Sequence, residues 1–142
     1  MAGHWGKADV PPHGLRLLAL DGGGVRGLSP LLILEQLMER INPVSPPKPC
    51  DYFDLIGGTS TGGLIALMLG RMRMSIEEAK DAYEKLSPRI FTKERHRWNV
   101  FGQVQGRFSH EELEKGVIEM LAKQNLPDDT LLQDLSSPSC RT

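Results

Sequence analysis

The stretch that decides the fold is Ile56-Gly57-Gly58-Thr59-Ser60-Thr61-Gly62-Gly63, a glycine-rich run between two apolar segments. Residues 52–56 (YFDLI) before it are short, aromatic and apolar enough to form a buried strand. Residues 64–69 (LIALML) after it are apolar on every side, as expected of a core helix, but they are too few to span a membrane. The pattern predicts a strand, a sharp turn and a buried helix, with Ser60 at the apex of the turn.

Within this stretch, Gly58-Thr59-Ser60-Thr61-Gly62 fits the G-x-S-x-G pattern of a nucleophile elbow. In an elbow the serine occupies a strained turn, and the flanking glycines, here Gly58 and Gly62, let neighbouring backbone pass close to it. The unpaired N–H groups of the following helix would lie beside the anion that forms on an attacked ester. Gly70 is expected to end this helix in a left-handed cap. Taken alone, the pattern more often marks an ordinary glycine-rich turn than a catalytic site. In the context of a strand, a turn and a helix, both interpretations fit about equally well.

A second glycine motif follows residues 15–20 (LRLLAL), which read as an earlier buried strand. Asp21-Gly22-Gly23-Gly24-Val25-Arg26-Gly27 contains three consecutive glycines, each of which loses more backbone entropy on folding than any other residue. Such a loop indicates a site that needs bare backbone. Gly22, Gly24 and Gly27 also fit G-x-G-x-x-G, so a dinucleotide-binding unit is an alternative. Against it, no acidic residue closes a second strand about 20 residues on, and the Gly-Lys-Ser or Gly-Lys-Thr of a P-loop is absent from the sequence.

The residues between the two motifs predict a helix followed by a connector. Ser29 suits the helix N-cap and Pro30 the first helical position. One face of this helix is apolar, with Leu31, Leu34, Met38 and Ile41. Asn42-Pro43 ends the helix, and further prolines indicate an extended surface connector. The order is therefore a βαβα unit with parallel strands and a right-handed crossover, which places both glycine motifs at the carboxyl ends of their strands.

Two more helices are expected downstream. Ser75-Ile76-Glu77-Glu78 has the form of a capping box, and the apolar stripe that follows runs until Pro88. Ser109-His110-Glu111-Glu112 repeats this device before a second stripe. Residues 89–108 between the helices lack periodicity and interleave basic and aromatic side chains. This region fits a solvated loop whose aromatics anchor it to the core, or a lid that touches anionic lipid.

Composition describes an ordinary globular protein of 142 residues, with 39% hydrophobic residues, 25% charged residues and a net charge of -1. The charge argues against nucleic acid as a main partner. Cys50 and Cys140 form neither a disulfide framework nor a metal-spaced cluster, so a reducing compartment is expected. Residues 1–14 contain no apolar stretch of a secretory signal and read as a flexible N-terminal segment. A cytoplasmic location with peripheral contact to membranes is expected.

Together the two motifs favour acyl transfer. The backbone N–H groups of Gly22, Gly23 and Gly24 would form one wall of an oxyanion hole. The N–H of Thr61, one residue past the nucleophile, would add a second donor. Arg26 would fix the loop or add a positive field. The sequence therefore predicts half of an acyl-transfer site.

Spacing alone identifies no base for Ser60. Asp81 lies within a helix beside two lysines, where a solvated face is expected. His96 lies in the basic loop and His110 in the first turn of a helix, and both read as surface residues. Residues 110–114 (HEELE) lack the second histidine of a zinc helix, so no metal site is predicted.

The segment Asp21-Gly22-Gly23-Gly24-Val25-Arg26-Gly27, combined with Gly58-Thr59-Ser60-Thr61-Gly62-Gly63, resembles the start of the patatin-like phospholipase family. The resemblance is strongest over residues 15–71 and extends through the helical region. Cys50-Asp51-Tyr52-Phe53-Asp54 is similar to patatin-like domains of fungal multidomain proteins. The resemblance implies an α/β fold, a three-layer α/β/α sandwich with a mainly parallel sheet. Residues 15–142 would be the N-terminal portion of that domain, truncated at the C-terminus.

The family resemblance also implies an activity, the hydrolysis of acyl esters of phospholipids and neutral lipids at transient lipid surfaces, without a catalytic metal or other cofactor. By motif match Ser60 is the nucleophile, and Gly22, Gly23, Gly24 and Arg26 form the oxyanion segment. In the family an aspartate from a late Asp-Gly-Gly or Asp-Gly-Ala motif activates the serine, and no such motif follows Ser60 in this sequence.

We therefore expect a lipid hydrolase whose aspartate lies beyond residue 142, in a longer chain with further domains, and an inactive isolated fragment. The alternative is a non-catalytic patatin-like module used for interaction or regulation in a larger protein.

Overall fold

The computed structural model describes residues 14–91, 110–132 and 140–142. Its sheet contains strands β1 (Leu17–Leu20) and β2 (Leu55–Gly58), which pair in parallel with Leu17 beside Leu55 and Leu20 beside Gly58. At the other edge of β2, Arg141 forms a parallel bridge with Leu55, and its carbonyl accepts a hydrogen bond of 2.9 Å from the N–H of Ile56. The predicted α/β fold with a parallel sheet is confirmed.

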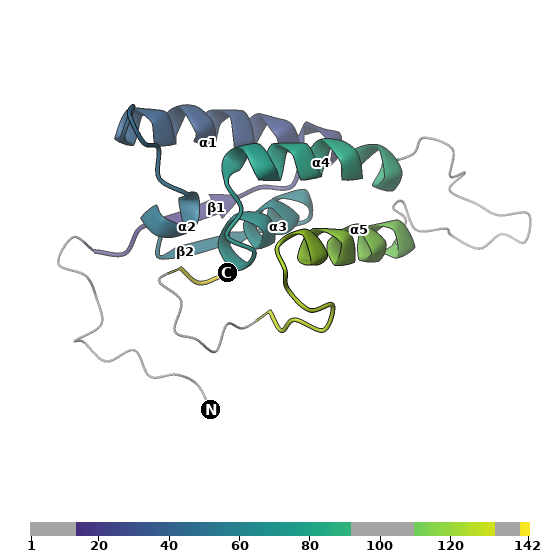
Figure 1. Cartoon of the computed structure of the whole chain (residues 1–142). Coiled ribbons are helices and arrows are strands. Elements are labelled where there is room, and N and C mark those ends of the chain that lie inside the picture. Colours follow the sequence, from purple (N-terminus) through teal and green to yellow (C-terminus); the bar gives the residue numbers. More distant parts are fainter. Residues whose placement is uncertain (1–13, 92–109, 133–139) are drawn as a thin grey trace, which may run out of the picture.

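Helices make up most of the rest of the described chain. They are α1 (Leu28–Ile41) after the 3-10 turn η2 (Gly24–Gly27), α2 (Pro49–Tyr52), α3 (Thr61–Ala66) continuing into the π turn η3 (Leu67–Arg71), α4 (Ile76–Ile90) and α5 (His110–Lys123). Figure 1 shows α1 and α4 side by side on one side of the molecule, with α5 next to α4. The chain therefore places its helices against one another as well as against the sheet.

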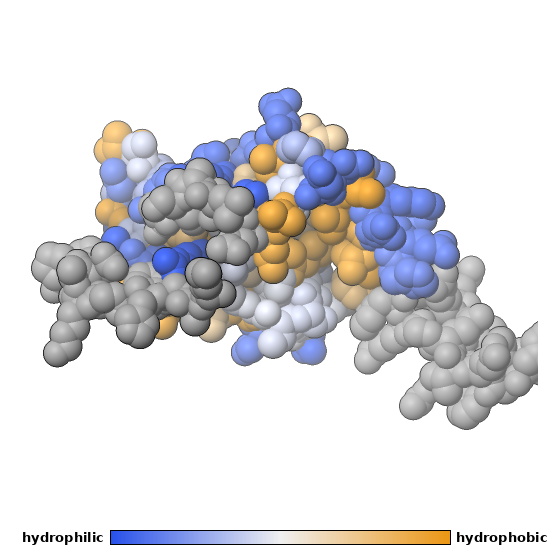
Figure 2. Space-filling view, turned by 90° about the horizontal axis from the view of Figure 1, so that it is seen from below, coloured by the Kyte–Doolittle hydropathy of each residue, from blue (hydrophilic) through white to orange (hydrophobic). Residues whose placement is uncertain are grey.

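One hydrophobic core joins these elements. The sheet contributes Leu20 and Ile56, and each of the longer helices buries one stripe, such as Leu31 and Leu34 on α1. Successive side chains of a strand point to opposite faces of the sheet, and the face opposite Leu20 and Ile56 is exposed. On that face Leu17 is 61% exposed and Leu55 beside it is 41% exposed. Figure 2, viewed from the side opposite α1 and α4, shows hydrophobic surface in the middle of that face. Among the described residues the helices thus cover one face of the sheet, and a three-layer sandwich would need a further layer on the other.

The predicted N-terminus of α4 is confirmed atom by atom. The N–H of Glu78 donates to Ser75 Oγ at 3.1 Å, and the N–H of Ser75 donates to Glu78 Oε2 at 2.6 Å. This is the reciprocal pair of a capping box. The apolar stripe predicted after it is buried in full: Ile76, Ala79, Tyr83 and Leu86.

Three predicted boundaries are wrong. Ser29 is not the N-cap of α1, because η2 leads directly into the helix and Gly27 takes that position. Gly70 does not end the helix after the elbow, since the π turn passes through it and the left-handed residue is Arg73, with φ 52°. Pro88 lies inside the last turn of α4, which continues to Ile90 because the N–H of Phe91 still reaches the carbonyl of Ser87 at 2.9 Å.

Other boundaries move or fall outside the described residues. β2 starts at Leu55 rather than residue 52, because Pro49 opens the short helix α2. Most of the basic and aromatic region, with His96 and the Ser109 cap, lies outside the described residues, as do residues 1–13. Within the described ranges, none of the helices combines the length and the hydropathy needed to cross a bilayer.

Candidate active site

Ser60 occupies the turn between β2 and α3. Its backbone has φ 52° and ψ -123°, a conformation that costs a non-glycine residue about 1–3 kcal/mol. The surrounding turn holds it there, since the N–H of Gly62 bonds to the carbonyl of Thr59 at 2.9 Å and that of Leu64 to the carbonyl of Ser60 at 3.1 Å. The residue is exposed. The predicted strand, sharp turn and helix are therefore present, with the serine at the apex at the carboxyl end of β2.

The turn is packed against the end of β1 by direct backbone contact. A Cβ atom at Gly62 would lie 2.6 Å from the carbonyl carbon of Leu20 and 2.8 Å from the carbonyl oxygen of Asp21. A Cβ at Gly58 would lie 2.7 Å from the carbonyl oxygen of Leu20. No side chain fits at these distances, so both glycines of the G-x-S-x-G pattern are required by close approach. The contact fixes where the loop after β1 leaves the sheet.

That loop runs directly beside the serine. A Cβ at Gly22 would lie 2.9 Å from Ser60 Cβ and 3.5 Å from Ser60 Oγ. Gly24 has φ +57°, which glycine adopts at little cost. Within the described part of the chain, the N–H groups of Gly22, Gly23, Gly24 and Thr61 donate to no protein acceptor. The structure thus brings a strained serine next to a loop of unpaired backbone donors.

Two side-chain hydroxyl groups form hydrogen bonds with the backbone of this loop. Tyr83 Oη, on α4, and Thr61 Oγ1, on α3, both donate to the carbonyl oxygen of Gly24, the second at 3.5 Å. A Cβ at Gly27 would lie 2.6 Å from Tyr83 Cζ and 2.5 Å from Thr61 Cγ2, so the end of the loop rests on these two side chains. The sequence predicted Tyr83 only as part of a buried stripe. The available signal was a phenol at a core position, because a buried tyrosine hydroxyl needs a hydrogen-bond partner.

The charged candidates do not converge on Ser60. Arg26 is exposed at the end of η2, and its N–H donates to the carbonyl of Gly23 at 3.2 Å, which closes the turn. Asp81 is exposed on α4, and His110 is exposed at the first residue of α5. Within the described ranges, Ser60 Oγ forms no hydrogen bond with a carboxylate or an imidazole. Nor, among the same residues, does any group of three or more His, Cys, Asp or Glu side chains lie together so that it could hold a metal ion.

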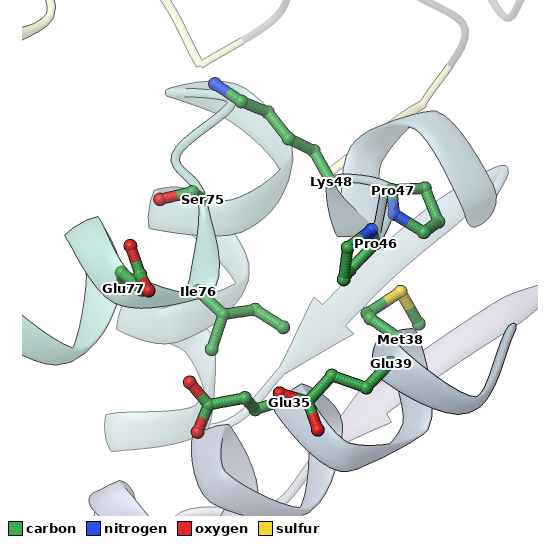
Figure 3. Close-up of a pocket in the computed structure, with 9 residues that line it drawn as sticks. All are labelled: Glu35, Met38, Glu39, Pro46, Pro47, Lys48, Ser75, Ile76 and Glu77. Atoms are coloured by element: carbon green, nitrogen blue, oxygen red, sulfur yellow. The ribbon is translucent and has the colours of Figure 1, made fainter. Parts of the chain in front are cut away.

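A groove on the described part of the molecule lies away from Ser60. A groove of about 260 Å³ separates the C-terminal half of α1 from the N-terminus of α4. Figure 3 shows the side chains that line it, namely Glu35, Met38, Glu39, Pro46, Pro47, Lys48, Ser75, Ile76 and Glu77. None of these residues belongs to the elbow or to the loop after β1, so the groove is separate from Ser60.

Comparison with known proteins shows which family the chain resembles in sequence. The family description "Patatin-like phospholipase" matches residues 18–138. The chain is 32% identical over 132 residues to "Calcium-independent phospholipase A2-gamma" of Mus musculus. The aligned region covers 92% of this chain and 16% of that protein. It is 31% identical over 137 residues to "Patatin-like protein 2" of Arabidopsis thaliana, covering 89% of this chain and 34% of the relative.

A rice relative is more similar over a shorter region. The chain is 43% identical over 96 residues to "Patatin-like protein 1" of Oryza sativa subsp. indica, which covers 62% of this chain and 23% of that protein. The chain thus corresponds to about a third or less of the length of these relatives. Because the family match extends from β1 through α5, this chain belongs to the patatin-like phospholipase family.

Proposed function

We propose that this chain carries the nucleophile and the oxyanion-binding loop of a lipid acyl-ester hydrolase. The observation that carries the proposal is the contact between Gly22 and Ser60, which places a strained, exposed serine beside the loop. The free N–H groups of Gly22, Gly23, Gly24 and Thr61 supply donors of the kind that stabilise a developing oxyanion. Membership of a phospholipase family supports an acyl lipid as the substrate.

The proposed reaction has two halves. Ser60 Oγ attacks the carbonyl carbon of the ester, its proton passes to a carboxylate base, and the loop N–H groups bind the resulting oxyanion. The intermediate collapses, the C–O ester bond breaks, and the alcohol leaves with the proton. Water then attacks the acyl-enzyme and gives its proton to the same base, which releases the fatty acid and restores Ser60. The dipole of the helix that starts at Thr61 favours the negative charge in both halves.

The base in this proposal is an aspartate beyond residue 142. No Asp-Gly-Gly or Asp-Gly-Ala follows Ser60 in the sequence, and the relatives are several times longer than this chain. Arg26, exposed on η2, adds a positive field near the loop without an ion-pair partner among the described residues. The resulting Ser-Asp dyad needs neither a histidine nor a catalytic metal. Substrate is met at a membrane or lipid surface, which the protein touches from the cytoplasm.

A fluorophosphonate probe tests the assignment of Ser60 in the full-length protein. We expect the probe to label the wild type and not Ser60→Ala, and ester hydrolysis by the variant to fall by on the order of 10⁴ or more. Ser45→Ala, a change at an exposed serine of the connector, is the matched control and should label like the wild type. Equal labelling of wild type and Ser60→Ala would refute the assignment. A wild type that is neither labelled nor active would favour the non-catalytic module instead.

A further inference from the structure

Tyr83 reaches the candidate oxyanion loop from a distant part of the chain. It lies on α4, 59 residues after Gly24, and is 2% exposed. Its hydroxyl donates to the carbonyl oxygen of Gly24, and its ring tip packs where a Cβ of Gly27 would be. One side chain thus contacts both ends of η2.

The carbonyl of Gly24 is the point where the loop is held. Gly24 has φ +57°, and glycine adopts positive and negative φ angles about equally readily. The local backbone preference therefore does not by itself fix the direction of this carbonyl. Hydroxyl groups from two separate helices, Tyr83 Oη and Thr61 Oγ1, converge on this one oxygen. Because a peptide unit is planar, fixing this carbonyl fixes the peptide between Gly24 and Val25. It thereby anchors the C-terminal end of the loop that carries the N–H groups of residues 22–24. The same loop carries Gly22 against Ser60.

We infer that Tyr83 is a positioning residue for this site: by holding the Gly24 carbonyl, it keeps the N–H groups of residues 22–24 directed at the oxyanion beside Ser60. The inference rests on the proposed function, because it concerns how the proposed loop is aimed. Donors that stabilise a transition state must be preorganised, and a shift of about 1 Å at a catalytic group lowers rates by as much as 10²-fold.

The hydroxyl is suited to this role. Burial raises the pKa of Tyr83 above its ordinary value of 10.0, so the phenol stays protonated and remains a donor at neutral pH. Thr61 is also buried, at 5% exposed, and its hydroxyl adds a second, longer bond to the same oxygen. The Gly24 carbonyl is thus held by donors from α4 and α3, outside its own turn.

Tyr83→Phe removes the hydroxyl and keeps the ring that fills the core. The chain contains two tyrosines, and Tyr52→Phe makes the same change on α2, away from the loop. We expect kcat of the full-length enzyme to fall roughly tenfold in Tyr83→Phe with KM nearly unchanged. Affinity for a trifluoromethyl ketone, which forms an oxyanion adduct with the serine, should fall in parallel. Tyr52→Phe should behave like the wild type in both measurements.

Amide hydrogen exchange gives a readout that does not need turnover. The peptide that covers residues 21–27 should exchange faster in Tyr83→Phe than in Tyr52→Phe, whereas exchange in α5 should match between them. Thr61→Val tests the second donor. Because both hydroxyls bond the same oxygen, the fold-losses of Tyr83→Phe and Thr61→Val should fail to multiply in the double variant.

These outcomes separate failure of the inference from failure of the proposed function. Loss of the proposed function appears as a wild type without Ser60-dependent labelling or turnover. If the wild type is active but Tyr83→Phe keeps its kcat and its ketone affinity, Tyr83 does not position the loop. Unchanged exchange of residues 21–27 overturns the inference in either case. If Tyr83→Phe does not fold, Thr61→Val carries the same kcat and exchange tests for the Gly24 carbonyl.

Discussion

Two close contacts in the molecule are built from different atoms. One is the crossing near Ser60, where the end of β1 and the loop after it (Leu20 and Asp21) pass over Gly62, and the other is the contact between α4 and α5. At the crossing, the carbonyl groups of Leu20 and Asp21 face the Cα of Gly62 with no side chain between them. Between α4 and α5, Leu86 packs onto Gly116, and Arg89 reaches across the same contact to Glu112 at 3.0 Å. Both regions use a glycine to allow close approach.

What differs is how far each contact can relax. At the crossing the neighbouring atoms are backbone, which belongs to the sheet and cannot move without breaking it. At the helix contact the neighbour is the end of a leucine side chain, which has other rotamers. The same substitution, glycine to alanine, should therefore cost much more at the first site than at the second.

Gly62→Ala should produce the largest effect. Its Cβ would lie 2.6 Å from the Leu20 carbonyl carbon, so strand β1 or the elbow must shift. We expect a loss of about 3 kcal/mol or more in the free energy of unfolding, measured by urea denaturation, and loss of the proposed activity. Gly57→Ala, on strand β2 just before the turn, is the matched control, since nothing lies within 4 Å of its Cβ. A similar loss in both variants would contradict the backbone argument.

The contrast also explains what could be predicted from the sequence. The capping box at Ser75 and the buried stripe of α4 depend on residues a few positions apart, so local pattern was sufficient. The elbow was predictable for the same reason, because its glycines flank Ser60 directly. By comparison, the π turn through Gly70 and the start of α1 depend on what the rest of the chain packs against them, and those predictions are wrong.

Long-range contacts at the site were beyond local pattern. The link from Tyr83 to Gly24 spans 59 residues, and no spacing rule connects a tyrosine in a helical stripe to a glycine loop. The contact of Gly22 with Ser60 could be inferred only from topology, which places both loops at the carboxyl ends of adjacent parallel strands. The base remains a prediction, since it depends on sequence beyond residue 142.

Gly116→Ala should have a smaller effect than Gly62→Ala. The new Cβ would overlap Leu86 Cδ1 and lie 3.3 Å from Leu86 Cγ, and a rotamer change relieves part of this. Alanine is also about 1 kcal/mol better than glycine in a helix interior, so we expect a net loss of about 1 kcal/mol. In a Leu86→Ala background the clash is gone and the same change should stabilise the protein. An equal loss in both backgrounds, measured by urea denaturation, would show that Leu86 is not the cause.

The smallest effect concerns the cap of α4 and depends on pH. The hydrogen bond from the Ser75 N–H lowers the pKa of Glu78 below its ordinary value of 4.5. Because the folded state favours the charged form, this contribution to stability is present above about pH 4.5 and is lost as pH falls through the lower, folded-state value. Glu78→Gln should therefore lose less thermal stability than the wild type between pH 5 and pH 3.

Glu84→Gln is the control for that measurement, because it removes a carboxylate from the exposed side of the same helix. Its melting temperature should follow the acid dependence of the wild type, while that of Glu78→Gln should vary less with pH. If both variants show the same acid dependence, the cap carboxylate is not selectively stabilised by the Ser75 N–H. The α4 side of the comparison would then rest on apolar packing, such as that of Leu86 on Gly116, rather than on its hydrogen-bonded terminus.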